Sequence, residues 1–326
     1  MKDNKVIVSS SPHIRDPITT AQIMRLVFIA LLPAAIWGIY SFGLQVFLII
    51  ITSIVTSILS EFLYQVITKQ KITIKDGSAA LTGLLLALTV SPQTPLWMIA
   101  IGASCAIIIA KQLFGGLGSN FVNPALFGRA VIFLSWTAIL NKWPKPQYNF
   151  FKFVTSTTPY ITTATPLDLF RSGNLQISTS LYKDLFFGNI GGSIGETSKL
   201  LLLLGIVFLF LIRKDIIDLK IPFTIILTVA VTSIILKQDP LFHILSGGLI
   251  IGAFYMATDY VTSPVTNLGK IIYGIGIGAL TVIIRNFGVY PEGVSFAILS
   301  MNVVTPFLDQ LKPRIFGTGV KKWKIL

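Results

Sequence analysis

Charged residues are scarce in this sequence of 326 residues. Asp, Glu, Lys and Arg make up 12% of it and hydrophobic residues 53%, whereas soluble proteins have about 25% charged residues. The mean hydropathy is +0.78. This composition excludes an ordinary soluble domain and predicts an all-α polytopic membrane protein.

Cysteine and histidine are also rare, with one and two residues. Cys105 lies in the apolar run "IAIGASCAIIIA" and is expected to pack in the core, since one thiol forms neither an internal disulfide nor a multi-thiolate metal site. His13 and His243 are too few for a metal site, so we predict none. The first 22 residues are polar, which argues against a signal peptide.

Motifs of nucleotide-driven and hydrolytic enzymes are missing. The sequence has no Walker motif, no HExxH and no GxGxxG after a strand. We therefore expect no such catalysis by this chain alone.

Apolar segments long enough to be membrane spans recur along the chain, taking about 20 residues per crossing as the yardstick. The segment 78–91 is short and ends at "SPQTP", so we expect a broken or tilted helix there. About ten spans are predicted, at 24–41, 44–67, 78–91, 95–114, 124–140, 197–213, 221–236, 241–258, 269–285 and 292–311.

Lys and Arg together number 26 against 13 acidic residues, a net charge of +13. With the N-terminus in the cytoplasm, most basic residues outside the long loop fall on the cytoplasmic side, as expected of topology-setting charge. This reading leaves no need for a nucleic-acid partner, and it places residues 141–196 outside the cytoplasm. The cytoplasmic set comprises Lys69, Lys71, Lys75, Lys111, Arg213, Lys214, Lys220, Lys270, Lys312, Arg314, Lys321, Lys322 and Lys324.

The two halves of the chain resemble each other. "GSAALTGLLLALTVSPQTP" at 77–95 corresponds to "GGLIIGAFYMATDYVTSPVTN" at 247–267, and the alignment pairs Lys111 with Arg285 and Asn123 with Asn302. Because each half has five spans, the second is predicted to be inverted, and a site is expected between such repeats. The predicted organisation is a cytoplasmic segment 1–22, a first repeat 23–140, an extracytoplasmic loop 141–196, a second repeat 197–311 and a basic cytoplasmic tail 312–326.

Several polar residues fall within or near the predicted spans. Ionised side chains inside a membrane need partners or water, and an interfacial structural role is expected for Glu61 and Asp309. The set comprises Glu61, Asn120, Asn123, Arg129, Asp259, Arg285, Asn302 and Asp309.

Four blocks carry a resemblance to a known family: "SPHIRDPITTAQIMRLVFIALLPA", "GGLGSNFVNPALFGRA", "ATDYVTSPVTNLGKIIYGIGIG" and "IIRNFGVYPEGVSFAILSMNVVTPFLD". The sequence resembles the family formed by the D subunit of the Rnf ferredoxin:NAD oxidoreductase and, more distantly, the B subunit of the sodium-pumping NADH:quinone oxidoreductase. The resemblance runs in order from residue 9 to about 311.

That family carries FMN joined by a phosphoester to a threonine in a Ser/Thr-Gly-Ala-Thr motif, commonly followed by Pro-Leu. The matching stretch here is "TTATPL", so the resemblance implies covalent FMN on Thr165, beside Thr162, Thr163 and Ala164. Thr163 replaces the usual glycine, which could slow the modification or shift it to Thr162 or Thr163. Pro166 favours an extended, accessible backbone at Thr165.

The family also holds a non-covalent riboflavin within the spans. The resemblance implies contacts from Asn120 and Asn123, whose amides both donate and accept hydrogen bonds; Asp259 is a further candidate. The alternative for the two asparagines is that they cap the helix that starts at Pro124.

The resemblance thus implies a multi-pass subunit of the cell membrane of a bacterium or archaeon, part of a translocase-type oxidoreductase and not catalytic alone. It would relay electrons between ferredoxin and NAD, coupled to Na⁺ or H⁺ movement, beside membrane lipid, a second FMN-carrying subunit and membrane iron-sulfur subunits. The rival hypotheses are a stand-alone inverted-repeat transporter or channel and a structural scaffold.

Overall fold

The computed structural model describes residues 18–146, 148, 164–175, 177–214, 216–288 and 292–311, and these form helices joined by loops, without a β-sheet. The first half contains α1 (Thr20–Phe42), α2 (Leu44–Ile67), η1 (Ile74–Asp76), α3 (Ser78–Leu88), α4 (Leu96–Ile108), η2 (Gln112–Phe114), α5 (Pro124–Ser135) and α6 (Thr137–Leu140). Local signals set these bounds: Thr19 and Gln22 form a capping box at the start of α1, and Gly43 at φ 89° separates α1 from α2.

The connecting segment and the second half are also helical. Two short helices, α7 (Pro166–Arg171) and α8 (Thr179–Phe187), precede η3 (Ile194–Glu196). The second half contains α9 (Lys199–Ile212), α10 (Lys220–Ile235), α11 (Pro240–Leu245), α12 (Leu249–Ile251), the π-helical turn η4 (Gly252–Met256), α13 (Asn267–Phe287) and α14 (Val294–Asp309).

Helices occupy all ten predicted spans, but only part of the predicted count is supported. Within the described residues, four helices are long and apolar enough to cross a membrane: Thr20–Phe42, Leu44–Ile67, Leu96–Phe114 and Asn267–Phe287. Five shorter apolar helices accompany them: Ser78–Leu88, Pro124–Ser135, Lys199–Ile212, Lys220–Ile235 and Val294–Asp309. The chain is therefore helical and polytopic, and the number ten stays a prediction.

Two of the predicted spans are interrupted. The helix α3 has 11 residues, which at 1.5 Å per residue gives about 16 Å, short of the roughly 30 Å of a bilayer core. The segment 241–258 is divided into α11, α12 and η4, with Gly247 at φ 60° between α11 and α12. The short or broken helix predicted at 78–91 is confirmed, whereas 241–258 was predicted only as a span and the breaks within it were not predicted.

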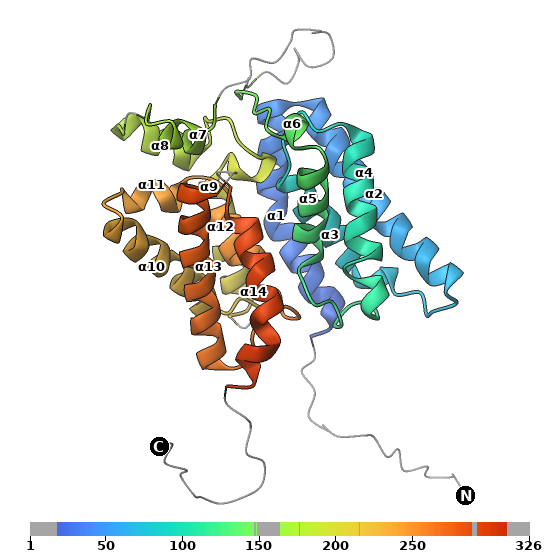
Figure 1. Ribbon diagram of the computed structural model, residues 1–326. Helices are drawn as coiled ribbons and strands as arrows, with labels where there is room; N and C mark the ends of the chain where they lie inside the picture. Colours follow the sequence, from blue (N-terminus) through green and yellow to red (C-terminus); the bar gives the residue numbers. More distant parts are fainter. Residues whose placement is uncertain are drawn as a thin grey trace, which may run out of the picture.

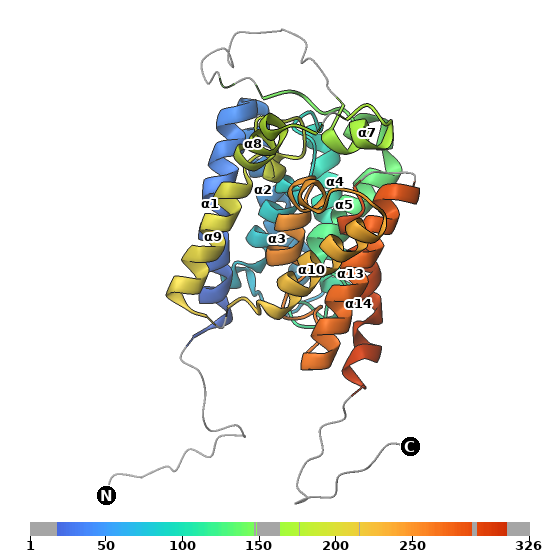
Figure 2. The same cartoon turned by 90° about the vertical axis from the view of Figure 1, so that its left-hand side faces the viewer.

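The two halves lie side by side, with α1 to α5 on one side and α9 to α14 on the other (Figure 1). They meet where α1 packs against α9 and α5 against α14, and the first of these pairs is seen directly in Figure 2. The start of α1 and the end of α14 lie at the same end of the bundle, while α7 and α8 cover the opposite end. We refer to these as the terminal end and the α7 end.

Helices α4 and α5 approach each other closely because both carry glycine at the crossing. A Cβ on Gly128 would lie 2.6 Å from the carbonyl oxygen of Gly102, and one on Gly102 would overlap the side chain of Ile132. Such small-residue contacts are typical of membrane helix pairs. The crossing holds α5, and the loop before it, in place against the first half.

Candidate functional site

A pocket opens between the two halves near the terminal end. It encloses about 770 Å³, including the part that opens to solvent. The walls come from α1, α3, the loop before α5, the segment after α9, and η4 with the loop that follows it. Apolar lining residues include Val27, Leu81, Leu85 and Phe254, and polar ones include Ser78, Lys111, Asn120, Asn123 and Asp259.

The structure brings the three residues proposed for riboflavin, Asn120, Asn123 and Asp259, to this one pocket. Asn120 is buried; its Nδ2 donates to the carbonyl of Val122 at 3.3 Å, and its side chain also hydrogen-bonds to Asp259. The Oδ1 atom of Asn120 is buried without a hydrogen-bond partner. An unsatisfied buried acceptor beside a pocket is a place where a donor from a ligand or water fits.

Asn123 has a structural role in addition to its place at the pocket. It is the N-cap of α5, and its Oδ1 accepts from the backbone N–H of Leu126 at 3.2 Å. Its Nδ2 donates to the carbonyl of Met256 in η4 at 3.2 Å, across the boundary between the halves. The capping alternative is thus confirmed for Asn123, while Asn120 caps no helix.

Asp259 lies in the loop between η4 and α13. Its Oδ2 accepts from the hydroxyl of Thr262 at 3.1 Å. Burial raises the pKa of its carboxyl above the ordinary value of 3.8, against the opposing hydrogen bonds from Thr262, the backbone N–H of Val261 and Asn120. Burial therefore holds this carboxyl closer to neutral than an exposed aspartate would be.

Lys111, which lines the pocket, belongs to a buried ion pair that sequence reasoning missed. The Nζ of Lys111 lies 2.9 Å from Oε2 of Glu61, and both side chains are 1% exposed or less. We expected Lys111 among the basic residues of the cytoplasmic side and an interfacial structural role for Glu61; the pairing of the two was not predicted. A signal was available in the sequence: Glu61 and Lys111 are isolated charges of opposite sign in apolar segments, and each such charge requires a partner.

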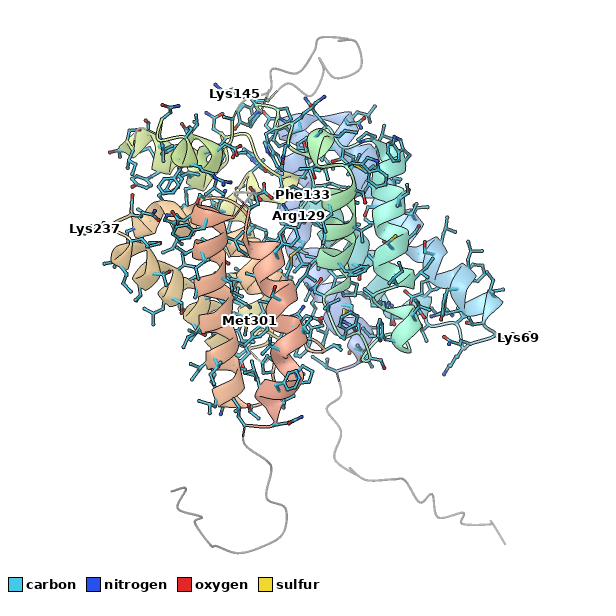
Figure 3. The ribbon with its side chains drawn as sticks, in the orientation of Figure 1. Lys69, Arg129, Phe133, Lys145, Lys237 and Met301 are labelled. Atoms are coloured by element: carbon cyan, nitrogen blue, oxygen red, sulfur yellow. The ribbon has the colours of Figure 1, made fainter. Side chains whose placement is uncertain are left out.

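Asp309 and the two buried arginines all have polar partners, although Nε of Arg285 is buried without a hydrogen-bond partner. Asp309 accepts from the backbone N–H of Val265 at 2.8 Å, the structural role that we predicted. Arg129 pairs with Glu292 of the segment before α14, and Figure 3 shows it on α5 facing α14. Arg285 donates to the carbonyls of His243 and Ser246 at 2.6 and 2.9 Å.

Thr165 lies at the α7 end, far along the bundle from the pocket. Its backbone is extended, as Pro166 predicts, and it forms the N-cap of α7 in a capping box with Asp168. Its Oγ1 donates to Oδ2 of Asp168 at 2.6 Å and accepts from the backbone N–H of Asp168 at 3.1 Å. Ala164 is exposed, but Thr165 is only 5% exposed, so the expected accessibility of its side chain is wrong. Thr162 and Thr163 lie outside the described residues.

Comparisons with known proteins match nearly the whole chain. The family model described as "NQR2, RnfD, RnfE family" matches residues 7–317. The chain is 44% identical over 333 residues to the D subunit of the proton-translocating ferredoxin:NAD(+) oxidoreductase complex of Clostridium ljungdahlii, covering 98% of both chains. It is 45% identical over 326 residues to the D subunit of the Na(+)-translocating ferredoxin:NAD(+) oxidoreductase complex of Acetobacterium woodii, covering 99% of both. It is 35% identical to the D subunit of the ion-translocating oxidoreductase complex of Cronobacter sakazakii, covering 95% and 98%.

Proposed function

The chain belongs to the NQR2, RnfD, RnfE family, and from this membership we propose that it is a membrane subunit of an ion-translocating ferredoxin:NAD(+) oxidoreductase complex, relaying electrons through bound flavins. The pocket between the halves would hold riboflavin, and Thr165 would carry FMN. The flavins would supply the redox chemistry, and the protein their position and surroundings. The partners would be the other subunits of that complex, including a second FMN-carrying subunit and membrane iron-sulfur subunits.

The observation that carries the proposal is the unpartnered Oδ1 of Asn120 in a mainly apolar pocket between the halves. Small-molecule pockets typically have apolar walls and a few polar groups that set the orientation of the ligand. The ring system of riboflavin is flat, largely apolar and edged with donors and acceptors, including an N–H that suits a free amide oxygen. The residues present therefore fit this group.

Thr165 supplies the single hydroxyl that a phosphoester needs, and Pro166 holds its backbone extended. It lies at the α7 end, whereas the pocket lies near the terminal end. With the termini in the cytoplasm, electrons passing between the two flavins would move charge along the membrane normal. That movement supplies a physical reason for coupling to a cation of compensating charge.

The two relatives of nearly equal identity differ in the cation that their names give. One relative at 44% identity is named proton-translocating and one at 45% is named Na(+)-translocating. A rival function is a stand-alone transporter or channel, for which a pocket between two halves is also suitable. That rival predicts no flavin.

The experiment is to purify the protein from cells with and without a flavin transferase. We expect yellow protein, riboflavin that is released on mild denaturation, and flavin fluorescence in a denaturing gel only with the transferase. Colourless protein under both conditions would overturn the proposal and favour the transporter. Released riboflavin without covalent fluorescence would leave the pocket assignment standing and remove the one at Thr165.

A further inference from the structure

The ion pair of Lys111 with Glu61 is held by more than one contact. The Nζ of Lys111 donates to both carboxylate oxygens of Glu61, at 3.0 and 2.9 Å. Gln112 adds a hydrogen bond to Oε1 of Glu61 at 2.8 Å, and Gln65 adds one at 3.3 Å. A buried ion pair generally stabilises a fold no better than apolar packing. Stability alone therefore does not explain a lysine and a glutamate at this position, and we looked for a functional role.

The third hydrogen bond of the Lys111 ammonium begins a path of hydrogen bonds from the core toward the surface. Nζ of Lys111 donates to Oγ of Ser78 at 2.6 Å, and this hydroxyl donates to Oδ1 of Asp76 at 2.7 Å. Lys111 and Ser78 are buried, whereas Asp76 in η1 is only partly buried. A continuous hydrogen-bonded chain therefore joins a carboxylate that water reaches to an ammonium inside the protein.

Both inner members of the chain, Ser78 and Lys111, line the pocket, and Lys111 is the cation among its described lining residues. The acidic group facing the pocket from the other half is Asp259, and the phenols of Tyr255 and Tyr260 come from η4 and the loop after it. The side chains that α1 contributes are apolar. Negative charge arriving in the pocket would thus find one ammonium in its wall.

We propose that Lys111 donates a proton into this pocket and is reprotonated from Asp76 through Ser78. The inference rests on the proposed function, because it needs an occupant that becomes a base when an electron donor of the complex reduces it. The N–H bond of Lys111 breaks and the occupant gains the proton. The hydroxyl of Ser78, which donates to Asp76 in this structure, then turns so that its proton passes to Nζ. Asp76, after taking a proton from water, gives that proton to Ser78, so one proton enters from solvent.

The relay can be tested in the complete complex by stopped-flow reduction with dithionite, following proton uptake with a pH indicator and the flavin by its absorbance. Ser78→Ala breaks the chain but keeps the ion pair of Lys111 with Glu61. Asp76→Asn keeps a side-chain oxygen that can accept from the backbone N–H of Ser78, as Asp76 does at 2.8 Å, but it cannot carry the proton. Ser53→Ala is the matched control. It removes a buried hydroxyl that donates to the carbonyl of Gly83 and takes no part in the hydrogen-bonded path from Asp76 to Lys111.

We expect Ser78→Ala and Asp76→Asn to slow proton uptake per bound riboflavin by at least about 100-fold, the usual scale of a lost acid–base group. Asp76 is outside the pocket lining, so Asp76→Asn should also keep its riboflavin content. The control should match wild type. Lys111→Met alone would leave the buried carboxylate of Glu61 without its cation, so we pair it with Glu61→Gln to keep the net charge of the site. This double variant should also lose fast proton uptake. Wild-type uptake rates in riboflavin-loaded Ser78→Ala and Asp76→Asn would overturn the relay. A wild-type complex without riboflavin would instead overturn the proposed function.

Discussion

The side-chain amide of Asn123 joins the two halves of the protein, because its Nδ2 donates to the carbonyl of Met256 at 3.2 Å. The same side chain caps α5. The amide of Asn302 satisfies its neighbours when its Nδ2 faces the hydroxyl of Tyr273, and its Oδ1 then accepts from the backbone N–H of Asn123 at 3.0 Å. The start of α5 is thereby tied to η4 and α14. A substitution at Asn123 would therefore remove hydrogen bonds in both halves.

The first prediction concerns the amides at the pocket. Asn120→Leu together with Asn123→Leu should remove the extractable riboflavin and leave covalent FMN in place. A lost cap costs about 1 kcal/mol, so the protein should still be expressed and inserted. Flavin released by mild denaturation and quantified by chromatography is the measurement.

Single variants separate capping from binding. Asn120→Leu alone should lose riboflavin without affecting the cap of α5, because Asn120 caps no helix. Asn174→Leu, at an exposed position on the loop after α7, is the control. Riboflavin at wild-type stoichiometry in the double variant would return both asparagines to purely structural roles.

The second prediction isolates one hydroxyl. Thr165→Val keeps the shape but removes the acceptor, so in-gel flavin fluorescence should vanish, whereas Thr165→Ser should retain part of it. Valine also removes the cap of α7, at a cost of about 1 kcal/mol. Asp168→Ala is the control, because it breaks the same capping box and leaves the hydroxyl of Thr165 intact.

Mass spectrometry of the 153–171 peptide completes that experiment. FMN found on Thr162 or Thr163 in Thr165→Val would make the residue assignment wrong while leaving the flavin function intact. A wild-type peptide without flavin mass, despite the transferase, would remove the support for electron relay through this segment.

A third prediction follows from the ion pair of Lys111 with Glu61. Lys111→Met should lower the free energy of unfolding by about 3–5 kcal/mol, because it leaves the buried carboxylate of Glu61 unpaired. Combining it with Glu61→Gln should recover much of that loss. Thermal unfolding in detergent is the measurement, and equal melting temperatures of the single and double variants would contradict the coupling.

The fourth prediction is a pH dependence. Asp218 accepts from Nζ of Lys270 at 2.6 Å and from the backbone N–H of Lys220 at 3.0 Å. Burial acts to raise the pKa of Asp218, but these two lysines outweigh it and hold the pKa below its usual 3.8. A depressed pKa stabilises the folded state above the unfolded value, and that contribution disappears as the pH falls through the folded value.

Asp218→Asn should therefore unfold more easily than wild type at neutral pH, by up to about 1 kcal/mol, since the pair is partly exposed. The difference should close once the pH is well below 3.8. Melting temperatures across this range check it. A difference that persists or grows in acid would show that the carboxylate is not the cause.

The fifth prediction tests topology. A reporter inserted near Gly173, in an exposed turn at the α7 end, should read as extracytoplasmic. A reporter after Lys322 should read as cytoplasmic, because basic residues gather on that side. Opposite results would invert the arrangement and place the proposed covalent flavin in the cytoplasm.

The positions of the apolar helices were predictable because each helix depends on apolar content in one local stretch of sequence. The short helix α3 was signalled by "SPQTP", and the cap at Asn123 by the proline that follows it. The break in 241–258 was missed because Gly247, Gly248 and Gly252 also suit close helix packing, and only the surrounding helices decide between the two. The pairing of Glu61 with Lys111 was missed because their 50-residue separation appears in no local pattern.

If FMN is attached to Thr165 as proposed, the covered hydroxyl of this residue would set an order of events for the attachment. Its oxygen is bonded to Asp168 on both the donor and the acceptor side, and the residue is 5% exposed. An enzyme that attaches a group there would need this hydroxyl to be released from Asp168, so its rate would depend on the fraction of molecules in which the capping box is open. A phosphodiester on the same oxygen removes the donated proton and adds a negative charge beside a carboxylate. The capping box therefore cannot re-form unchanged, and the modified first turn of α7 would differ in its hydrogen bonds from the unmodified one.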